Sequence, residues 1–415
     1  MKGKPFRGIY ITLIALLSLA FSISAFAGGP ILGARSTGMG TAFTAVADDP
    51  STIAVNPAGL TQLTGTEVYG GSTFIIPSTE YTSPSGRTEE TEFQIFFPPH
   101  IYMVSDLKKD KLRFGFGIFS LYGIGGRKWD EDGLTRYSST ESFIATLSFN
   151  PVVAWKISPV LSVGAGVNYM LSRTNSKKMV DQSLLGARDG KMELEGMGDG
   201  WGYNFGILLT PEEHWSLGFA YRSKIRVTHE GDLEVKHIAP ALQPMFGGST
   251  FKTDAETPAT FPDIVSFGIA YRPTKDWTLG LDFEWFGWSS FQDAELKIDD
   301  EVPEANFTDT SAPLDWKDIW TIKAGAEYKM NEKIALRAGY AYIETQIPEQ
   351  TLDASAPDAD QHNFSLGFGY RMGTVVMDFF YMAGFFEDRK VRNNLLSGTY
   401  ENFNHYFGFS VGKKF

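Results

Sequence analysis

The stretch WTLGLDFEWF, residues 277–286, alternates apolar or aromatic side chains with small or polar ones. One face carries Trp277, Leu279, Leu281, Phe283 and Trp285, and the other carries Thr278, Gly280, Asp282, Glu284 and Phe286. Alternation with a period of two is typical of a β-strand whose two faces meet different surroundings. A run of about ten residues is also long enough for a tilted strand to cross a bilayer. This stretch therefore predicts a membrane-spanning strand.

The same pattern recurs in fourteen segments, at 66–79, 97–107, 111–125, 141–157, 161–180, 200–211, 215–233, 258–273, 277–298, 317–330, 334–348, 361–371, 374–391 and 400–415. Short polar turns follow the even-numbered segments. Long polar loops follow the odd-numbered ones, at 80–96, 126–140, 181–199, 234–257, 299–316, 349–360 and 392–399. This asymmetry is typical of outer-membrane barrels, and a closed barrel pairs every backbone group, as lipid requires. We therefore predict an all-β fold, a 14-stranded antiparallel transmembrane β-barrel over residues 66–415.

A soluble β-sandwich would also alternate, but its strands are typically about 5 to 6 residues long. The last segment ends in the C-terminal Phe415, which resembles the terminal signature of outer-membrane barrels. After the N-terminal region, no uncharged run reaches the roughly 18 residues that a helical span needs. These features favour a multi-pass barrel in the outer membrane of a Gram-negative bacterium.

Composition and charge exclude several classes of function. The 415 residues carry a formal charge of −12 and include 43 Gly and 33 Phe but no Cys. The negative charge argues against nucleic acid as a partner, and the lack of Cys excludes disulfides, zinc–thiolate sites and cysteine nucleophiles. The six His are scattered without ligand spacing. We expect no metal and no cofactor, and we interpret the acidic stretches 130–132 and 299–301 as solvated loops rather than calcium sites.

Residues 1–27 have the parts of a secretory signal peptide. Basic residues precede an apolar run at 9–20, and Ala-Phe-Ala at 25–27 offers a cleavage site. The alternative, an N-terminal membrane anchor, would need a longer apolar run.

Residues 28–65 do not alternate and are rich in Gly and Ala. The stretch 42–47 looks weakly helical, Asp48 and Asp49 can cap a turn, and Asn56-Pro57 can begin one. A small, apolar segment of this kind can pack inside a barrel. We therefore predict that 28–65 forms an N-terminal hatch, a plug in the lumen.

Short motifs along the chain carry a more specific signal: STGMGTA at 36–42, ADD at 47–49, NPA at 56–58, SLYG at 120–123, YRS at 221–223, WSSF at 288–291, and the region of Pro348 and 358–361. Together they resemble the FadL family, outer-membrane transporters of long-chain fatty acids and of aromatic hydrocarbons. The resemblance covers essentially the whole mature chain. It implies a 14-stranded barrel with a hatch and diffusive uptake without an energy-coupling partner. We expect a monomer surrounded by outer-membrane lipid and lipopolysaccharide.

The resemblance also implies a route for a hydrophobic substrate. The substrate is caught in a groove between extracellular loops and passes to a lumenal pocket. After a hatch movement, it leaves sideways through a wall gap at a kink in the third strand. The kink matches Ser120, Leu121, Tyr122 and Gly123, the hatch element matches Asn56, Pro57 and Ala58, and the capture groove matches by position Leu184, Leu185, Ile238, Leu242, Met245 and Phe246. No local motif identifies the deep pocket, and the groove residues have an alternative interpretation as packing between loops.

Three arginines on polar strand faces, Arg222, Arg272 and Arg371, offer groups that could hold a carboxylate. The alternative for these arginines is an ion pair with a lumenal acid, such as Asp282, Glu284 or Glu327.

Three other classes of function remain open: an outer-membrane enzyme acting on lipid, an adhesin, and a water-filled porin. The sequence GFSVG at 408–412 fits the serine-hydrolase pattern, but it lies in an alternating strand rather than at a strand–turn–helix elbow. We therefore predict no enzymatic activity. A plug in the lumen argues against a water-filled porin. An adhesin would need neither a plug nor an apolar loop, so these two features argue against adhesion as the function. The sequence does not choose between a fatty acid and an aromatic hydrocarbon.

Overall fold

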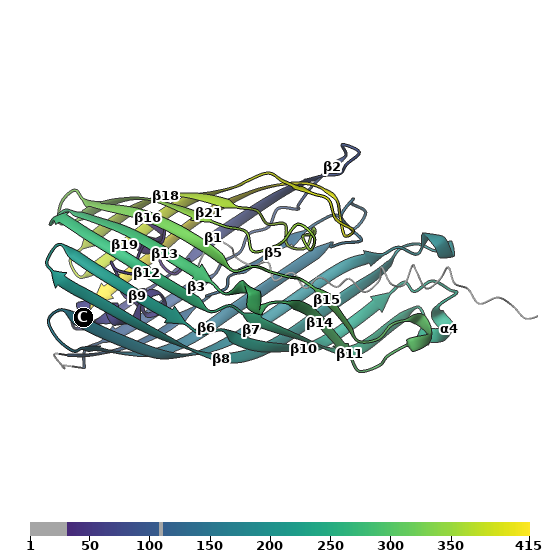
Figure 1. Cartoon of the computed structure of the whole chain (residues 1–415), viewed down its shortest axis with the longest axis horizontal. Coiled ribbons are helices and arrows are strands. Elements are labelled where there is room, and N and C mark those ends of the chain that lie inside the picture. The colour runs from purple at the N-terminus through teal and green to yellow at the C-terminus, as the bar shows by residue number, and fades with distance from the viewer. Residues whose placement is uncertain (1–30, 108–110) are drawn as a thin grey trace, which may run out of the picture.

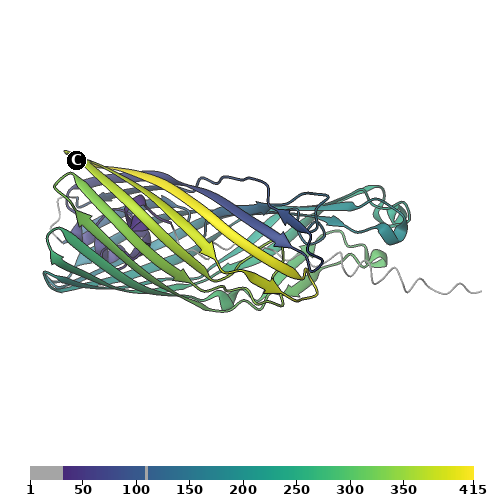
Figure 2. The ribbon, with the colours of Figure 1, turned by 90° about the horizontal axis from the view of Figure 1, so that it is seen from above.

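Antiparallel strands close into a barrel, as Figures 1 and 2 show. The barrel has fourteen passes. The computed structural model describes residues 31–107 and 111–415. The predicted 14-stranded barrel is confirmed, whereas the predicted signal peptide, 1–27, lies outside the described residues.

Within the described residues, eight passes are single strands: β1 (Thr66–Thr82), β3 (Pro99–Ser105), β6 (Glu141–Lys156), β7 (Leu161–Val180), β8 (Gly190–Glu212), β17 (Ile334–Ile343), β18 (Gln361–Met372) and β21 (Gly398–Lys414). The other six are interrupted: β4 (Leu112–Phe119) and β5 (Ile124–Lys128), β9 (Trp215–Arg222) and β10 (Ile225–Lys236), β11 (Thr250–Phe261) and β12 (Ile264–Thr274), β13 (Trp277–Phe286) and β14 (Asp293–Ile298), β15 (Thr310–Pro313) and β16 (Ile319–Lys329), and β19 (Val375–Phe386) and β20 (Arg389–Val391). The short β2 (Thr88–Glu90) pairs with the end of β1. The last pass pairs with the first along their length, which closes the barrel.

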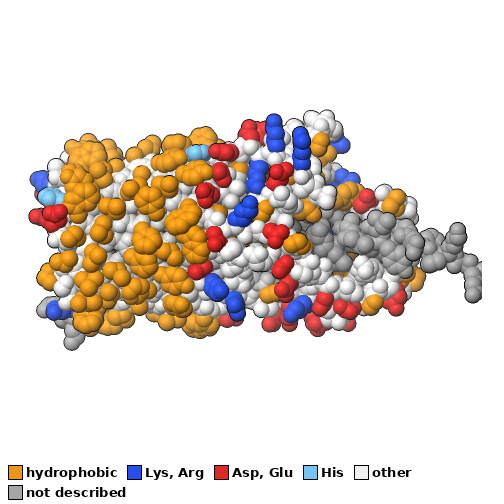
Figure 3. Space-filling model, in the orientation of Figure 1, with side chains coloured by type: hydrophobic (Ala, Val, Ile, Leu, Met, Phe, Trp, Pro, Cys, Tyr) orange, Lys and Arg blue, Asp and Glu red, His pale blue; other side chains and the backbone are white. Residues whose placement is uncertain are grey.

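The alternation that predicts the fold sorts side chains between lipid and lumen. In β13, Leu281 and Phe283 are exposed on the outer face, whereas Asp282 is buried on the inner face. The outer face shows a broad apolar belt, followed toward one end by charged side chains (Figure 3). Because lipid favours apolar surface, this belt marks the membrane-spanning part of the wall.

Short turns lie at one end of the barrel, called here the turn side, and the long loops lie at the other, the loop side. Both ends of the barrel sequence meet on the turn side, where the Phe415 N–H donates to the Thr66 carbonyl at 2.9 Å. On the loop side, β8 begins at Gly190 and β11 at Thr250, so the loops predicted at 181–199 and 234–257 are wrong in length. The first residues of β8 and β11 lie beyond the apolar belt, where the outer face of the barrel is charged. In the sequence, these residues therefore do not show the apolar alternation of a membrane-spanning strand.

Residues 31–65, called here the N-terminal segment, lie inside the barrel at its turn-side end (Figure 1). They contain α2 (Ala34–Gly38), α3 (Thr52–Val55) and the 3-10 helix η2 (Pro57–Gln62). Most of their side chains are buried. Among the described helices, none is both long and apolar enough to cross a membrane.

Candidate functional site

A buried ion network holds the start of the N-terminal segment. Arg35 contacts Asp48 at 2.5 Å and Glu327 on β16 at 2.9 Å. Glu327 also accepts from Arg337 on β17 at 2.6 Å, and Arg337 reaches Asp378 on β19 at 2.8 Å. Removing one member would leave a buried charge without its partner, which costs about 3–5 kcal/mol. The network therefore ties the segment firmly to three passes of the wall.

The middle of the segment is held by one wall carboxylate. Asp282 on β13 accepts from the backbone N–H groups of Phe43 and Thr44, both at 2.7 Å. The weak helix expected at 42–47 is therefore wrong: these N–H groups bond to the wall, and Ala47 has a φ of 38°. The weak helix propensity of this stretch is overridden by the hydrogen bonds from its backbone to the Asp282 carboxylate.

Asn56 links two parts of the segment and the wall. Its Nδ2 donates to the Thr44 carbonyl at 2.8 Å and to the Ile207 carbonyl of β8 at 3.1 Å, while its Oδ1 accepts from the Ala58 N–H at 3.2 Å. Gly206 makes the close approach possible, since a Cβ there would lie 2.1 Å from Asn56 Oδ1. Residues 56–58 are all buried, at the point where the segment rests against β8.

The third pass is interrupted between β4 and β5, at Ser120–Gly123. Gly123 has a φ of 88°, a left-handed conformation that suits glycine, and Leu121 and Tyr122 are buried. The ladder between β3 and β4 ends at the pair His100–Phe119. In the described chain, the next main-chain bond on this side of the third pass joins Glu92 N, in the segment between β2 and β3, to Lys128 O at 2.8 Å. The wall therefore lacks its backbone ladder between these points.

Apolar side chains fill this interruption from both faces. On the outside is an open recess of about 460 Å³, lined mostly by apolar residues: Pro99, Ile124, Ala145, Leu147, Leu171 and Met197. Across the interruption, the Phe96 and Phe143 rings lie with centroids 6.1 Å apart. Ile31 belongs to the same buried cluster as Phe96. The beginning of the N-terminal segment thus lies behind the unpaired part of the wall.

The loop-side residues expected to form a capture groove separate into two groups. Ile238, Leu242 and Phe246 are buried, and Leu185 is partly buried, within the apolar core of the loops. Leu184 and Met245 are 78% and 45% exposed. The helix α4 (Gln243–Phe246) places Phe246 against two other rings, Phe251 at 5.3 Å and Phe307 at 5.6 Å. These contacts match the alternative interpretation, in which the loops pack on one another.

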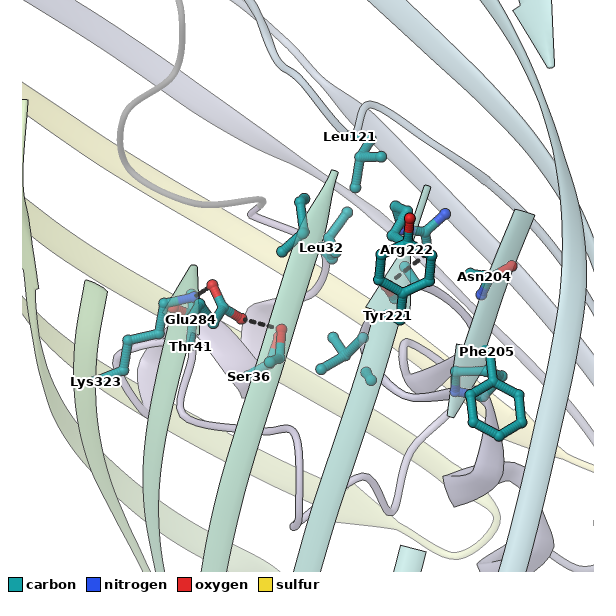
Figure 4. Close-up of a pocket in the computed structure, with 16 residues that line it drawn as sticks. Leu32, Ser36, Thr41, Leu121, Asn204, Phe205, Tyr221, Arg222, Glu284 and Lys323 are labelled. Carbon is teal, nitrogen blue, oxygen red and sulfur yellow. Dashed lines mark hydrogen bonds and ion pairs between the residues drawn. The ribbon is translucent and has the colours of Figure 1, made fainter. Parts of the chain in front are cut away.

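A small internal cavity of about 30 Å³ lies between the N-terminal segment and the wall (Figure 4). Arg222 on β9 lines it and is only 5% exposed. Its Nη2 donates to the Ala54 carbonyl of α3 at 2.8 Å, and its guanidinium lies 5.6 Å from the Phe119 ring centroid. Its Nη1 has no hydrogen-bond partner within residues 31–107 and 111–415. Leu121 of the interrupted third pass lines the same cavity.

The acids proposed as partners for the arginines bind other groups. Glu284 pairs with Lys323 beside the cavity, while Glu327 and Asp282 hold the N-terminal segment as described above. The sequence interpretation missed Lys323 as this partner, although its alternation places it on the polar face of its strand. Arg272 donates to Ser216 Oγ at 2.9 Å. Arg371 lies at the turn-side rim, where it lines a polar cavity of about 540 Å³.

The serine of the hydrolase-like motif lies in β21, and its Oγ is 2.7 Å from His100 Nε2. The same oxygen accepts from the Ala34 N–H at 2.9 Å. Among the residues that the structure describes, His100 Nδ1 has no hydrogen-bond partner and no carboxylate orients the ring as in a catalytic triad. This pair therefore attaches α2 to the wall and does not resemble a nucleophile with its base.

The sequence as a whole matches one family. A model of the outer membrane protein transport protein family, OMPP1/FadL/TodX, matches residues 18–415. The long-chain fatty acid transport protein of Salmonella typhi is 23% identical over 364 residues, covering 81% of this chain and 82% of that protein. The 47 kDa outer membrane protein of Pasteurella multocida is 25% identical, covering 89% of each chain.

Solved structures show the same fold. A FadL homologue of Pseudomonas aeruginosa matches with a TM-score of 0.83 at 20% identity, covering 94% of this chain and 100% of that one. The toluene transporter TodX of Pseudomonas putida matches with a TM-score of 0.74 at 17% identity, covering 92% of this chain and 98% of that one. Because the family model spans every pass of the wall and the segment enclosed by it, the chain belongs to the OMPP1/FadL/TodX family of outer-membrane transport proteins.

Proposed function

We propose that this protein takes up hydrophobic compounds passively, and that long-chain fatty acids are its substrates. The apolar-lined interruption of the wall and the family membership support transport of a hydrophobic molecule. The relative from Salmonella typhi is named as a long-chain fatty acid transport protein. Outer-membrane lipid and lipopolysaccharide surround the working protein, which acts as a monomer.

One observation carries the choice of a fatty acid, namely the unpaired nitrogen of Arg222. A buried guanidinium is stable only when anions or hydrogen-bond acceptors surround it. Arg222 has one such acceptor, the Ala54 carbonyl, and no acidic partner in the described structure. A carboxylate could complete its hydrogen bonds, whereas an aromatic hydrocarbon offers it no acceptor oxygen.

The route that we propose begins among the extracellular loops, near Leu184 and Met245, and continues to the cavity at Arg222. A movement of the N-terminal segment, acting as a hatch, then opens the way to the wall interruption at 120–123. An alkyl chain gains roughly 0.8 kcal/mol for each CH₂ that leaves water. Leaving sideways into lipid avoids returning that surface to water, which supports a lateral exit.

Extraction and mass spectrometry of copurified ligand test the substrate class directly. We expect a carboxylated amphiphile. An aromatic hydrocarbon would instead favour the second candidate substrate, for which the fold shared with TodX is the supporting observation.

Uptake assays in cells test the role of Arg222 with both substrates. We expect Arg222→Gln to lower oleate uptake roughly ten-fold, because a charge-assisted pair contributes about 1.5–3 kcal/mol, and to leave toluene uptake unchanged. Arg371→Gln is the matched control, since Arg371 lies at the rim and not in the cavity. Equal losses for oleate and toluene would indicate that Arg222 only seats the N-terminal segment, and would remove the basis for choosing a fatty acid.

A further inference from the structure

Tyr122 points into the barrel from the interruption of the third pass, and its backbone is fixed from the neighbouring pass. The Tyr122 N–H donates to Thr146 Oγ1 of β6 at 3.2 Å, and the Thr146 N–H donates to the Gly123 carbonyl at 3.0 Å. With the usual ladder replaced by these bonds, the chain turns inward and the Tyr122 side chain is buried. The residue is therefore held in place at its backbone, while its side chain extends into the lumen.

The Tyr122 side chain reaches a distant part of the wall. Its hydroxyl donates to the Pro262 carbonyl at 2.6 Å, and its ring lies 4.8 Å from the Phe261 ring, between centroids. Tyr122 belongs to the third pass, whereas Phe261 ends β11 and Pro262 follows it, both in the eighth pass. Passes so far apart along the sheet do not pair, so this contact crosses the lumen.

The opposite wall also bends inward to meet Tyr122. The ladder between β8 and β10 begins only at the pair Met197–Glu230. The part of β10 before Glu230 lies against the inner face of β8 instead. Glycines allow this approach: a Cβ on Gly198 would lie 2.1 Å from the Thr228 carbonyl oxygen. The start of β10, at Ile225, and its partner Phe261 are therefore displaced toward the lumen, where Phe261 is completely buried.

The cross-lumen contact lies next to the N-terminal segment, on the loop side of it. β4 runs toward the loops, and its Gly115 and Gly117 face Ile53 of α3. Tyr122 follows further along the same pass, directly after Leu121, which lines the Arg222 cavity. A molecule coming from the loops would thus meet the Tyr122 contact before it reaches that cavity.

We propose that Tyr122 is the gate residue of the lumen, whose bridge to Phe261 and Pro262 bars the way from the loop side to the Arg222 cavity and the wall interruption. This inference rests on the proposed transport function but does not depend on which substrate is carried. One hydrogen bond and one ring contact form the bridge, so an apolar ligand that replaces the Phe261 contact can displace the ring. Because the Tyr122 backbone stays bonded to β6, displacement of the ring opens the lumen while the wall interruption keeps its backbone bonds.

Cysteine labelling tests the gate without any substrate. The chain has no Cys, so Ala220→Cys, which lines the Arg222 cavity, gives a single reactive site. In intact cells, a membrane-impermeant maleimide should label this cysteine roughly five-fold faster when Tyr122→Phe removes the hydroxyl, since a hydrogen bond contributes about a five-fold difference in population. Tyr122→Ala should label faster still.

Tyr81→Phe is the matched control, because the Tyr81 hydroxyl also donates to a carbonyl, that of Ser397 at 2.7 Å, but belongs to the first pass and bonds a neighbouring loop. We expect it to leave the labelling rate unchanged. Each variant is first shown to be a folded barrel by its heat-dependent shift on an SDS gel. Equal labelling of folded Tyr122→Phe, Tyr122→Ala and Tyr81→Phe proteins would overturn the gate.

A cross-link gives the reverse test. In a Tyr122→Cys, Phe261→Cys double variant, a short bifunctional maleimide should lower uptake at least ten-fold, whereas the same reagent on either single variant should not. Unchanged uptake after complete cross-linking would also overturn the gate. If labelling responds as expected but oleate is not taken up by any variant, the gate stands and the fatty-acid proposal fails.

Discussion

Asn56 shows how much one side chain contributes to the attachment of the N-terminal segment inside the barrel. All three of its hydrogen bonds go to backbone groups, and one of them is on the wall. Asn56→Ala would leave these buried groups unsatisfied, which costs about 1–3 kcal/mol for each. We expect faster hydrogen exchange across residues 43–62 in the purified protein. Gln62→Ala is the control, because Gln62 bonds only within the segment, and equal exchange in the two variants would contradict a special role for Asn56.

Asp49 predicts a pH dependence in the same segment. Its carboxylate accepts from the Ser51 N–H at 2.9 Å just before α3, and burial raises the pKa of its carboxyl to about 6. Since this pKa lies above the unfolded value of about 3.9, the folded state holds the proton more tightly. Stability is therefore highest below about pH 4 and falls as the pH rises through 6.

Hydrogen exchange of residues 44–56, corrected for intrinsic rates, checks this dependence. Protection should decrease by up to about 3 kcal/mol between about pH 3 and pH 7, with most of the loss between pH 4 and pH 6, taking 1.36 kcal/mol for each pKa unit. Asp49→Asn should flatten the profile. A wild-type profile that is already flat would show that Asp49 titrates as it does in the unfolded chain.

The interrupted third pass is an element whose shape depends on one backbone conformation. Gly123→Ala would place a side chain at a φ of 88°, a strain of about 1–2 kcal/mol. We expect the kink to rearrange and uptake to fall several-fold, while the barrel still folds. Gly86→Ala is the matched control, because Gly86 has a φ of 81° with nothing within 4 Å, in a loop. Equal uptake by the two folded variants would contradict a transport role for the kink.

Regular elements could be predicted from the sequence, and irregular ones only in part. The strand β13 follows directly from residues 277–286, because every side chain there agrees with one face or the other. The interruption at 120–123 has no such local signal and was located by the family resemblance. The sequence misplaces the start of β8 because the outer face there is charged, with Lys191, Glu193 and Glu195, and so does not look membrane-spanning. The partners of Asp282 and Glu284 depend on which passes the barrel brings together, which no single stretch of sequence contains.

At the scale of the molecule, the apolar core inside the barrel continues into the loop side. Phe246, Phe251 and Phe307 come from different loops and strands, and their ring centroids lie 5.3 to 5.6 Å apart. Phe246→Ala should destabilise this core by up to about 3–5 kcal/mol without unfolding the barrel. Protease treatment of intact cells should then cleave between 237 and 249 faster than in Met245→Ala, whose side chain is largely exposed. Equal cleavage would contradict a shared core.

The attachment of α2 has a consequence for biogenesis. This helix lies near the beginning of the chain and leaves the ribosome early, yet its anchors are Glu327, Ser365 and Ser410, which are translated much later. An N-terminal fragment that ends before β16 therefore has none of these three anchors. Maturation of the interior must wait until translation is nearly finished, and a truncated precursor would expose its leading residues to periplasmic quality control.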